Sequence, residues 1–319
     1  MKKRLLVTRR LPDEIHARVA RDYEAVLNPE DRLYSTDDLV RLSADFDAFL
    51  VCLTDKLPRG AIEQLAPRLK VISTFSVGYE HVDAAAARAK GIAVGNAPNG
   101  VTIATAEIAM LLMLGATRRA PEGERMIAQG QWTGWTPMQL LGRRLDGKRL
   151  GILGLGKIGQ AVAKRARAFD MLIHYHSRSR RPPGEEQGAV YHPTLEGMLA
   201  ASDVLSIHAP STPETRHIIN ARNLALLPRG ALVINTARGD LVADEDLIAA
   251  LKSGQVGYAG LDVFEGEPKH HPGYLGLDTV FLLPHMGTSA IEARIDMGEE
   301  ALDNVDAYFA GRPLPHGVN

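Results

Sequence analysis

Residues Leu150–Gly159 read Leu-Gly-Ile-Leu-Gly-Leu-Gly-Lys-Ile-Gly, a hydrophobic segment that runs into a glycine-rich turn. Gly154, Gly156 and Gly159 give the spacing Gly-x-Gly-x-x-Gly. The first glycine of such a turn permits a tight bend, the second lets backbone amides approach a pyrophosphate, and the third lets a helix pack closely on the preceding strand. The positive end of the helix dipole then points at the phosphates. The stretch therefore predicts a dinucleotide-binding turn.

The flanking pattern distinguishes this interpretation from an ordinary turn between a strand and a helix. Residues 149–153 have the pattern of a buried strand, and residues 171–175 that of a second strand. The segment between them has a helical pattern over residues 161–168, and we expect the helix to run from Ile158 to about Phe169. This order is that of a βαβ nucleotide-binding unit. The expected cofactor contacts in the turn are Gly154, Leu155, Gly156, Lys157, Ile158 and Gly159.

The end of the second strand indicates which dinucleotide binds. Sites for NAD usually place Asp or Glu there, about 20 residues after the glycines, to accept hydrogen bonds from the ribose 2′-hydroxyl. Here residues 176–181 read His-Ser-Arg-Ser-Arg-Arg, and no acid occurs between Asp170 and Glu185. Arg can fork onto phosphate oxygens and Ser can donate a hydrogen bond, whereas a carboxylate would repel a 2′-phosphate.

We therefore expect NADPH or NADP as the cofactor, with NADH or NAD as the weaker alternative. The expected contacts at this end are Ser177, Arg178 and Ser179, and Arg178 and Ser177 are the best candidates for the phosphate itself. The competing interpretation is a solvated basic loop. It is less favoured because the basic run stands where the chemistry requires it.

Length and composition limit the class of protein. The chain has 319 residues, enough for two domains. Its 37 basic and 38 acidic side chains give a net charge of −1, so the charge does not favour nucleic acid or an anionic membrane as a partner. The N-terminus is too short in its apolar part for a signal peptide, and the longest apolar run, 108–114, is far below a membrane span. Cys52 is the only cysteine, which excludes an internal disulfide and a multi-cysteine metal site. We expect a soluble, cytoplasmic protein.

Strand and helix patterns alternate along the chain, which favours α/β layers built on parallel sheets. A first unit ends where Pro98-Asn99-Gly100 interrupts the pattern. A long apolar helix, about 103–118, then leads to the unit that contains the glycine turn, and a last helix, about 290–309, is expected to cross back to the first unit. The other predicted strands are 4–8, 48–53, 71–75, 92–94, 204–208, 232–235, 258–261 and 280–283, and further helices are predicted at 59–65 and 84–89.

The predicted fold class is thus α/β, with two Rossmann-like domains. A dinucleotide-binding domain with a parallel sheet, residues 100–286, is inserted into a discontinuous, flavodoxin-like substrate domain made of residues 1–99 and 287–319.

Three segments that follow strands of the second unit carry residues typical of catalysis. Arg238 lies in the first segment, Asp262 and Glu267 in the second, and His285 in the third. Because ligands of open α/β sheets bind beyond the carboxyl ends of the strands, we expect these side chains at the edge that carries the glycine turn. Each has an ordinary alternative: a surface arginine, a structural histidine or a solvated glutamate. Their shared position at one sheet edge favours a catalytic site.

These segments and several others resemble the D-2-hydroxyacid dehydrogenase family. The resemblance implies a homodimer of two-domain subunits with the active site in the interdomain cleft. Within the family, the basic end of the second strand resembles the NADPH-dependent glyoxylate/hydroxypyruvate reductase branch. The matching segments, in the family's order, are 73–83, 105–107, 147–159, 208–215, 235–240, 260–268 and 284–289.

The resemblance also implies a reaction and catalytic roles. A hydride passes between the nicotinamide C4 and C2 of a small 2-oxoacid, giving the D-2-hydroxyacid on reduction. Arg238 is expected to fork onto the carboxylate and carbonyl oxygens of the substrate, which orients and polarises the carbonyl, and His285 is expected to donate the proton. Glu267 is expected to hold the other imidazole nitrogen and to favour the protonated ring. Glu265 is the competitor, but the family's glutamate directly precedes the proline.

Further contacts are implied for substrate and cofactor. The backbone amides near Val77 and Gly78 are expected to bind the substrate carboxylate, and the alternative there is an ordinary strand-to-loop turn. Asp262 is expected to hold the nicotinamide carboxamide, and Thr105 to reach the cofactor from the start of the long helix, where a threonine without such a role is equally common. The other implied cofactor contacts are His208, Pro210, Thr215, Thr236, Ala237, Arg238, His285 and Gly287.

Two features leave alternatives open. Trp132 and Trp135 stand in a polar loop, where packing in a dimer is expected and lining of the partner subunit's substrate pocket is the alternative. His270 and His271 are interpreted as part of a solvated loop, and we expect no metal.

Other functions on this fold also stay open. One is a dehydrogenase of formate or phosphite. Formate oxidation needs no general acid, so Glu267, the expected partner of His285, argues against formate as the substrate. The other is a non-catalytic, dinucleotide-sensing corepressor-like protein that binds partner peptides.

Overall fold

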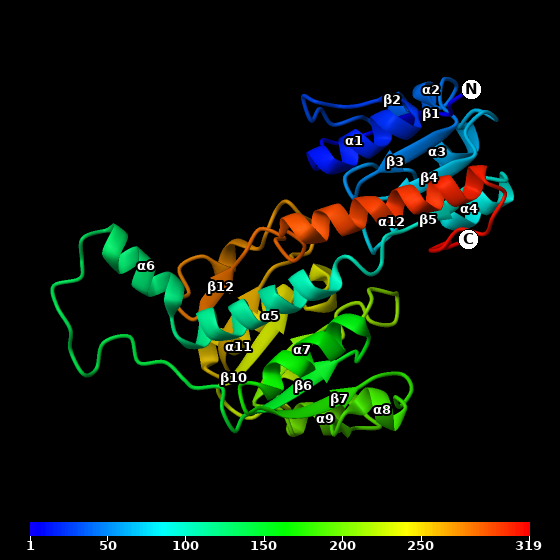
Figure 1. The fold of residues 1–319 in the computed structure, drawn as a ribbon. Helices are drawn as coiled ribbons and strands as arrows, with labels where there is room; N and C mark the ends of the chain where they lie inside the picture. Colours follow the sequence, from blue (N-terminus) through cyan, green and yellow to red (C-terminus); the bar gives the residue numbers. More distant parts are fainter. The chain divides into compact units, whose positions relative to one another are not determined.

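The computed structural model describes the whole chain, Met1–Asn319, and the chain divides into two compact units. Unit 1 comprises residues 1–102 and 288–319, and unit 2 comprises residues 103–287. Figure 1 shows the red C-terminal helix α12 (Ile291–Phe309) among the blue and cyan elements of unit 1. The chain therefore leaves unit 1, forms unit 2 and returns.

Unit 1 is built on a five-stranded parallel sheet in the order β2-β1-β3-β4-β5. Strands β3 and β4 are buried at every position, as expected for parallel strands covered by helices on both faces. The order 2-1-3-4-5 is that of flavodoxin-like sheets, so the predicted architecture of this unit is confirmed. The strands are β1 (Arg4–Val7), β2 (Glu24–Val26), β3 (Ala48–Val51), β4 (Val71–Thr74) and β5 (Ala93–Gly95).

Helices cover both faces of this sheet. One face packs against α2 (Thr36–Leu42), α3 (Arg59–Gln64) and α4 (Ala84–Ala89), whose apolar side chains join those of the strands in one core. Helix α12 packs with α1 (Asp13–Asp22), where the backbone of Gly298 lies against the side chain of Ile15. A Cβ at position 298 would approach an Ile15 side-chain carbon to 2.6 Å, so the helices can come this close only with glycine there.

Unit 2 is built on a seven-stranded parallel sheet in the order β12-β11-β10-β9-β6-β7-β8. The predicted strands are all present, with ends that differ by a few residues. Two short edge strands, β2 in unit 1 and β8 here, were not predicted. The strands of unit 2 are β6 (Arg149–Leu153), β7 (Leu172–His176), β8 (Val190–Tyr191), β9 (Val204–Ile207), β10 (Ala231–Asn235), β11 (Val256–Leu261) and β12 (Val280–Leu282).

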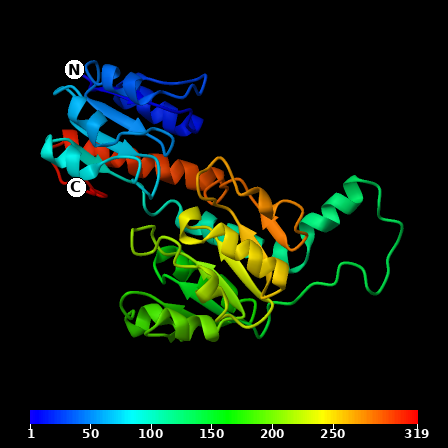
Figure 2. The same cartoon turned by 180° about the vertical axis from the view of Figure 1, so that it is seen from behind.

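Two apolar cores lie on the two faces of this sheet. One contains side chains of α5 (Thr102–Thr117) and α7 (Lys157–Arg167), and the other those of α9 (Leu195–Ala200), α10 (Ala221–Leu224) and α11 (Asp244–Ser253). Figure 2, seen from behind, brings the yellow α11 to the front, where Figure 1 has α5 and α7. A short helix, α8 (Pro183–Glu186), follows β7, and two 3₁₀ turns are η1 (Gly239–Leu241) and η2 (Pro272–Tyr274). No helix of the structure is both long and apolar enough to cross a membrane.

The strand order of unit 2 fixes where a ligand can bind. Strand β6 lies in the sheet between β7 and β9. From β6 the strand order continues through β7 and β8 to one edge of the sheet, and through β9, β10, β11 and β12 to the other. Open α/β sheets bind ligands at such a switch point, beyond the carboxyl ends of the strands. The glycine turn follows β6 at this point, and the loops after β9, β10, β11 and β12 lie along the same edge.

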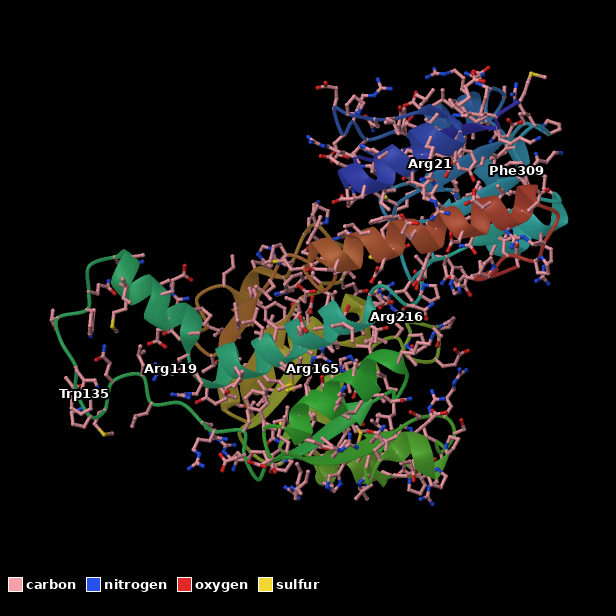
Figure 3. All side chains as sticks on the ribbon, viewed as in Figure 1. Arg21, Arg119, Trp135, Arg165, Arg216 and Phe309 are labelled. Carbon is pink, nitrogen blue, oxygen red and sulfur yellow. The ribbon has the colours of Figure 1, made fainter.

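One segment of unit 2 stands apart from its sheet. Helix α6 (Ala120–Ala128) and the loop after it project from the unit in Figure 1, and Figure 3 shows Trp135 at the far part of that loop. We call residues 119–143 the arm. Although α6 is amphipathic, none of its residues is buried. An apolar stripe on a surface helix normally faces a core, so this one lacks the cover that such a stripe requires.

Candidate active site

The glycine turn after β6 has the geometry that the sequence predicted for it. Gly154 has φ +95°, and a Cβ there would lie 2.9 Å from the backbone of His208, so only glycine fits. Gly159 packs α7 against the carbonyl of Gly154 with no room for a side chain. At Gly156, in contrast, a Cβ would meet no protein atom within 4 Å. The turn is therefore closed on the protein side and open at its middle glycine, where a pyrophosphate has room to approach.

The amides at the start of α7 are the donors that this site offers. The first N–H groups of a helix have no acceptor within it, and they add to the positive end of its dipole. Helix α7 has no acidic residue in its first turn and three basic residues in its last, a distribution that favours an anion at its N-terminus. The amide of Leu155 is an exception, because it donates to the hydroxyl of Ser177 at 2.9 Å. The expected contact of Leu155 with the cofactor therefore does not include its N–H.

The basic run after β7 divides into residues held by the protein and one that is not. Arg180 forms two hydrogen bonds to Glu186, at 2.8 and 3.1 Å, and the backbone N–H of Arg181 donates to Tyr175 at 2.9 Å. The buried Tyr175 hydroxyl donates to Glu186 at 2.6 Å. Arg178 is exposed. The loop is thus fixed at both ends, by Ser177 on the glycine turn and by Glu186 on α8, and Arg178 is the exposed arginine that forms no hydrogen bond or ion pair with the protein.

Other expected cofactor contacts lie on the loops after β9 and β10. His208 follows β9 and its Nε2 lies 2.8 Å from the hydroxyl of Ser206; burial lowers the pKa of His208 to about 4, so the ring is neutral at physiological pH. Thr215 folds its own loop, donating to the carbonyl of Pro210 at 2.8 Å. The hydroxyl of Thr236 is buried and has no hydrogen-bond partner in the protein. A buried polar group without a partner is costly, and a polar group of a bound nicotinamide nucleotide would satisfy it.

The structure brings His285 and Glu267 together. Nδ1 of His285 lies 2.6 Å from Oε2 of Glu267, and the other oxygen of Glu267 accepts the backbone N–H of Phe264 at 2.9 Å. Burial raises the pKa of Glu267, but the bonds to His285 and Phe264 and the charge of Arg238 outweigh it, and the net pKa lies below its usual value. Glu267 is therefore ionised near neutral pH. Since Nδ1 is engaged, Nε2 is the ring nitrogen that can give a proton to a substrate.

Glu265, the competing partner, points elsewhere. Its carboxylate lies 2.7 Å from Nε2 of His217 and also pairs with Arg216, which is labelled in Figure 3. The two glutamates, two residues apart, thus serve two different histidines. The structure pairs Glu267 with His285, as the family's proline-adjacent glutamate implied.

Arg238 stands on a loop that Asn235 and Gly239 shape. The side-chain amide of Asn235 donates to the carbonyl of Arg238 at 2.8 Å, and its oxygen accepts the N–H of Ala237 at 3.0 Å. Gly239 lies so close to the backbone of Phe264 that a Cβ has no space. This contact places the Arg238 loop against the loop of Glu267. Asn235 belongs to the motif that led us to Arg238, but its positioning role was not predicted, since nothing in the sequence says which way its amide points.

Asp262 holds the loop that carries His285. Its side chain is fully buried and accepts the N–H groups of Met286 at 2.6 Å and Gly287 at 2.7 Å. Burial raises the pKa of Asp262, although both of these hydrogen bonds favour the ionised form. Sequence reasoning assigned Asp262 to the nicotinamide carboxamide. The structure adds a role that we did not predict, because the carboxylate fixes the backbone on which His285 adopts a left-handed φ of +55°.

The Val77–Gly78 segment follows β4 in unit 1. The carbonyl of Val77 accepts from the Asn96 side chain at 2.7 Å, and that of Gly78 accepts from Ser76 at 2.6 Å. Neither amide donates a hydrogen bond to the protein. The carbonyls are thus anchored while both N–H groups keep their capacity for a ligand. A hydroxyl relay supports Ser76: it lies 2.7 Å from Thr74, which lies 2.9 Å from Nε2 of His81.

Comparison with known proteins agrees with this geometry. The family model of the D-isomer specific 2-hydroxyacid dehydrogenase NAD-binding domain matches residues 110–287. Glycerate dehydrogenase of Hyphomicrobium methylovorum is 46% identical over 319 residues, which cover 99% of each chain. The chain belongs to the D-isomer-specific 2-hydroxyacid dehydrogenase family. As in other members, residues 110–287 form a domain that binds a nicotinamide dinucleotide.

Two further members of the family bear on the function. Glyoxylate reductase of Thermococcus litoralis is 39% identical and is aligned with 100% of this chain and 97% of its own. Among solved structures, an NADPH-dependent glyoxylate/hydroxypyruvate reductase from Sinorhizobium meliloti, in complex with NADP and malonate, has a TM-score of 0.86 and 34% identity. The superposition covers 100% of this chain and 97% of that one. The protein is therefore similar over its full length to enzymes of the family.

The pair of His285 and Glu267 generates a test. Glu267→Gln keeps the shape of the side chain and removes the carboxylate that holds Nδ1 of His285. We expect kcat to fall about 10- to 100-fold, because the ring loses the group that orients it and stabilises its charge during proton transfer. Steady-state kinetics measure this. An unchanged kcat would contradict the pairing, and Glu265→Gln is the matched control that should leave kcat unchanged.

Proposed function

We propose that the protein reduces a small 2-oxoacid, such as glyoxylate or hydroxypyruvate, to the D-2-hydroxyacid with NADPH. The observation that carries the proposal is the 2.6 Å contact between His285 and Glu267 beside the Arg238 loop, at the sheet edge that also carries the glycine turn. Unit 2 would bind the dinucleotide and supply Arg238, Glu267 and His285, and unit 1 would supply the amides for the substrate carboxylate. The names of the relatives, glyoxylate reductase and glycerate dehydrogenase, support this class of substrate.

Each residue of the site would have its own role in the reaction. The cofactor, held by the glycine turn, supplies the hydride. Arg238 would fork onto the substrate, orient its carbonyl and stabilise the negative charge that develops on the oxygen. His285 would donate the proton from Nε2 to that oxygen while Glu267 stabilises the charged ring through Nδ1. The amides of Val77 and Gly78 would bind the substrate carboxylate.

The pairing of Glu267 with His285 also bears on the alternative reactions. Formate oxidation transfers a hydride without a proton donor, so it does not require a histidine that a carboxylate holds through Nδ1. A reduction requires that donor. The geometry therefore favours 2-oxoacid reduction over a formate-type reaction.

The test is a panel of spectrophotometric assays that follow oxidation or reduction of the cofactor. NADPH and NADH are each offered with glyoxylate, hydroxypyruvate and pyruvate, and NADP and NAD are each offered with phosphite and formate. We expect turnover with NADPH and at least one 2-oxoacid. His285→Ala should lower kcat by about 100-fold or more, because it removes the proton donor, and should leave NADPH binding nearly unchanged. His271→Ala, which removes a histidine bound to Glu245, is the matched control. Turnover with phosphite or formate alone, or full activity of His285→Ala, would refute the proposal.

We propose further that NADPH is preferred over NADH because of Arg178. Arg180 and Arg181 are committed to contacts within the protein, which leaves Arg178 to bind a 2′-phosphate. The charge of Glu214 lies close enough to interact with Arg178. A phosphate carries more charge than that carboxylate and would compete for the guanidinium.

Arg178→Ala should therefore raise the KM for NADPH far more than the KM for NADH. Loss of one charge-assisted contact corresponds to a change of about 10- to 100-fold in the KM for NADPH. Steady-state kinetics with both cofactors measure the ratio. Arg144→Ala, which removes an exposed arginine elsewhere in unit 2, should change neither KM. Equal effects of Arg178→Ala on the two cofactors would exclude its contact with the 2′-phosphate.

We also propose that two copies of the chain form a homodimer through the arm. Exposed apolar side chains are concentrated there: Ile127 (68% exposed), Trp132 (57%), Trp135 (80%), Met138 (76%) and Leu141 (54%). Large exposed apolar patches mark interaction sites, and aromatic and Met side chains are enriched at interfaces. Together with the uncovered stripe of α6, they support a second copy of this chain as the cover.

Light scattering after size exclusion measures the oligomeric state. We expect the wild type at twice the mass of the chain, and the double variant Ile127→Ser, Trp135→Ser at the mass of one chain at micromolar concentration. Leu33→Ser, which removes a similarly exposed apolar side chain from unit 1, is the control and should stay dimeric. A monomeric wild type, or a double variant that stays dimeric, would contradict an interface formed by the arm.

A further inference from the structure

Arg294 is a charged side chain that the reaction described so far does not use. It lies in the first turn of α12 in unit 1, and its guanidinium stacks over the ring of Phe75 at 5.8 Å. The side chain is half-buried and forms no ion pair and no side-chain hydrogen bond with the protein. Burial lowers the pKa of Arg294, which expresses the cost of keeping this charge away from water.

The protein provides no counter-ion for this charge. The titratable group that interacts with Arg294 is the thiol of Cys52, and burial raises the pKa of Cys52 to about 12. Cys52 is therefore a neutral thiol at physiological pH. Two acids interact with Cys52: Oδ2 of Asp55 accepts from Thr8 and from the Cys52 amide, although its Oδ1 has no partner, and Asp31 pairs with Arg9. Neither acid is among the groups that interact with Arg294. Partly buried charges in proteins are normally paired, so Arg294 is an unusual feature of unit 1.

The position of Arg294 points to a ligand. Cys52 directly follows β3, and Phe75 directly follows β4. The guanidinium therefore lies at the carboxyl edge of the unit 1 sheet, the edge where open α/β sheets bind ligands. The amides of Val77 and Gly78 follow Phe75 on the same loop, and neither has an acceptor in the protein. One edge of unit 1 thus combines a cation without a counter-ion and two N–H groups without acceptors, and all three favour an anion.

We propose that Arg294 is a substrate-binding residue whose guanidinium binds the carboxylate of the 2-oxoacid, together with the amides of Val77 and Gly78. This inference rests on the proposed function. A carboxylate has two oxygens with about four lone-pair sites, so it can accept the two amides and a guanidinium together. A role confined to stacking on Phe75 is the competing interpretation. It would make Arg294 a structural residue, indifferent to the substrate.

Steady-state kinetics of Arg294→Ala and Arg294→Lys distinguish the two roles. We expect the alanine variant to raise the KM for glyoxylate and hydroxypyruvate about 10- to 100-fold, the loss of a charge-assisted contact, with the KM for NADPH unchanged. The lysine variant keeps the charge but loses the forked geometry, so its KM for the 2-oxoacids should lie between that of the alanine variant and that of the wild type. Added guanidinium ion should restore part of the activity of Arg294→Ala, because it supplies the missing group. Arg312→Ala, an exposed arginine of the same unit, is the control and should behave as the wild type.

Direct binding of oxamate, a carboxylate that cannot be reduced in this way, gives a readout independent of turnover. Calorimetry with NADPH present should give a Kd for oxamate that rises at least tenfold in Arg294→Ala and stays unchanged in Arg312→Ala. An unchanged KM for the 2-oxoacids, an unchanged Kd for oxamate, or a loss of activity that falls equally on substrate and NADPH and is not rescued by guanidinium would overturn the proposal. So would a wild type that binds no oxamate. A wild type that reduces no 2-oxoacid, but loses its oxamate binding on Arg294→Ala, would refute the proposed function and leave the carboxylate site in place.

Discussion

The arrangement of the candidate site depends on one buried carboxylate, that of Asp262 at the end of β11. It accepts two backbone amides from the loop after β12 at 2.6 and 2.7 Å, and its side chain has no exposed surface. Removal of one partner from such a contact leaves a buried charge unsatisfied, at a cost of about 1–3 kcal/mol or more. The two bonds hold His285 at a φ of +55°, which non-glycine residues rarely adopt. From that position the ring meets Glu267. These two hydrogen bonds offset the free-energy cost of the strained backbone at His285.

A second constraint comes from the sheet itself. Parallel strands present their carboxyl ends at one edge, so loops distant in the sequence emerge side by side. The register pairs Asn235 of β10 with Leu261 of β11, and Leu261 with Leu282 of β12. The loops that carry Arg238, Glu267 and His285 start directly after these paired residues. Gly239 then allows the Arg238 loop to contact the backbone of Phe264. Hydrogen bonds of the backbone thus bring together candidate catalytic residues that are up to 47 residues apart (285 − 238 = 47).

The sequence predicted the elements whose pattern is set by burial, and missed those that lack it. Strands β6, β9 and β10 are apolar at nearly every position, because both faces of the sheet are covered, and their runs stand out. The edge strands β2 and β8 are short and half-exposed, so their residues carry no such signal. The glycine turn was predictable for a different reason: Gly154 and Gly159 stand where the protein leaves no space for a side chain, and their spacing is visible in the sequence.

Side-chain partners were much harder to predict than positions. The run at 176–181 identifies a basic loop, but it does not reveal that Glu186 holds Arg180 or that Ser177 takes the amide of Leu155. Glu265 and Glu267 are two positions apart in one loop, and only the resemblance to a family separated them in advance. The relay through Ser76 and the grip of Asn235 on the Arg238 loop depend on directions of hydroxyl and amide groups that a one-dimensional pattern does not contain.

The distribution of paired and unpaired charges sets Arg294 apart from the other arginines. Most arginines of this chain have an acid within reach, such as Arg18 with Asp306 or Arg149 with Asp203. Arg294 departs from this rule in a half-buried position, where a missing counter-ion costs most. A folded chain tolerates such a cost where function requires it. A cation without a counter-ion beside amides without acceptors is therefore best explained by an anion that arrives from solution, and in an enzyme of this family the anion with that chemistry is a carboxylate.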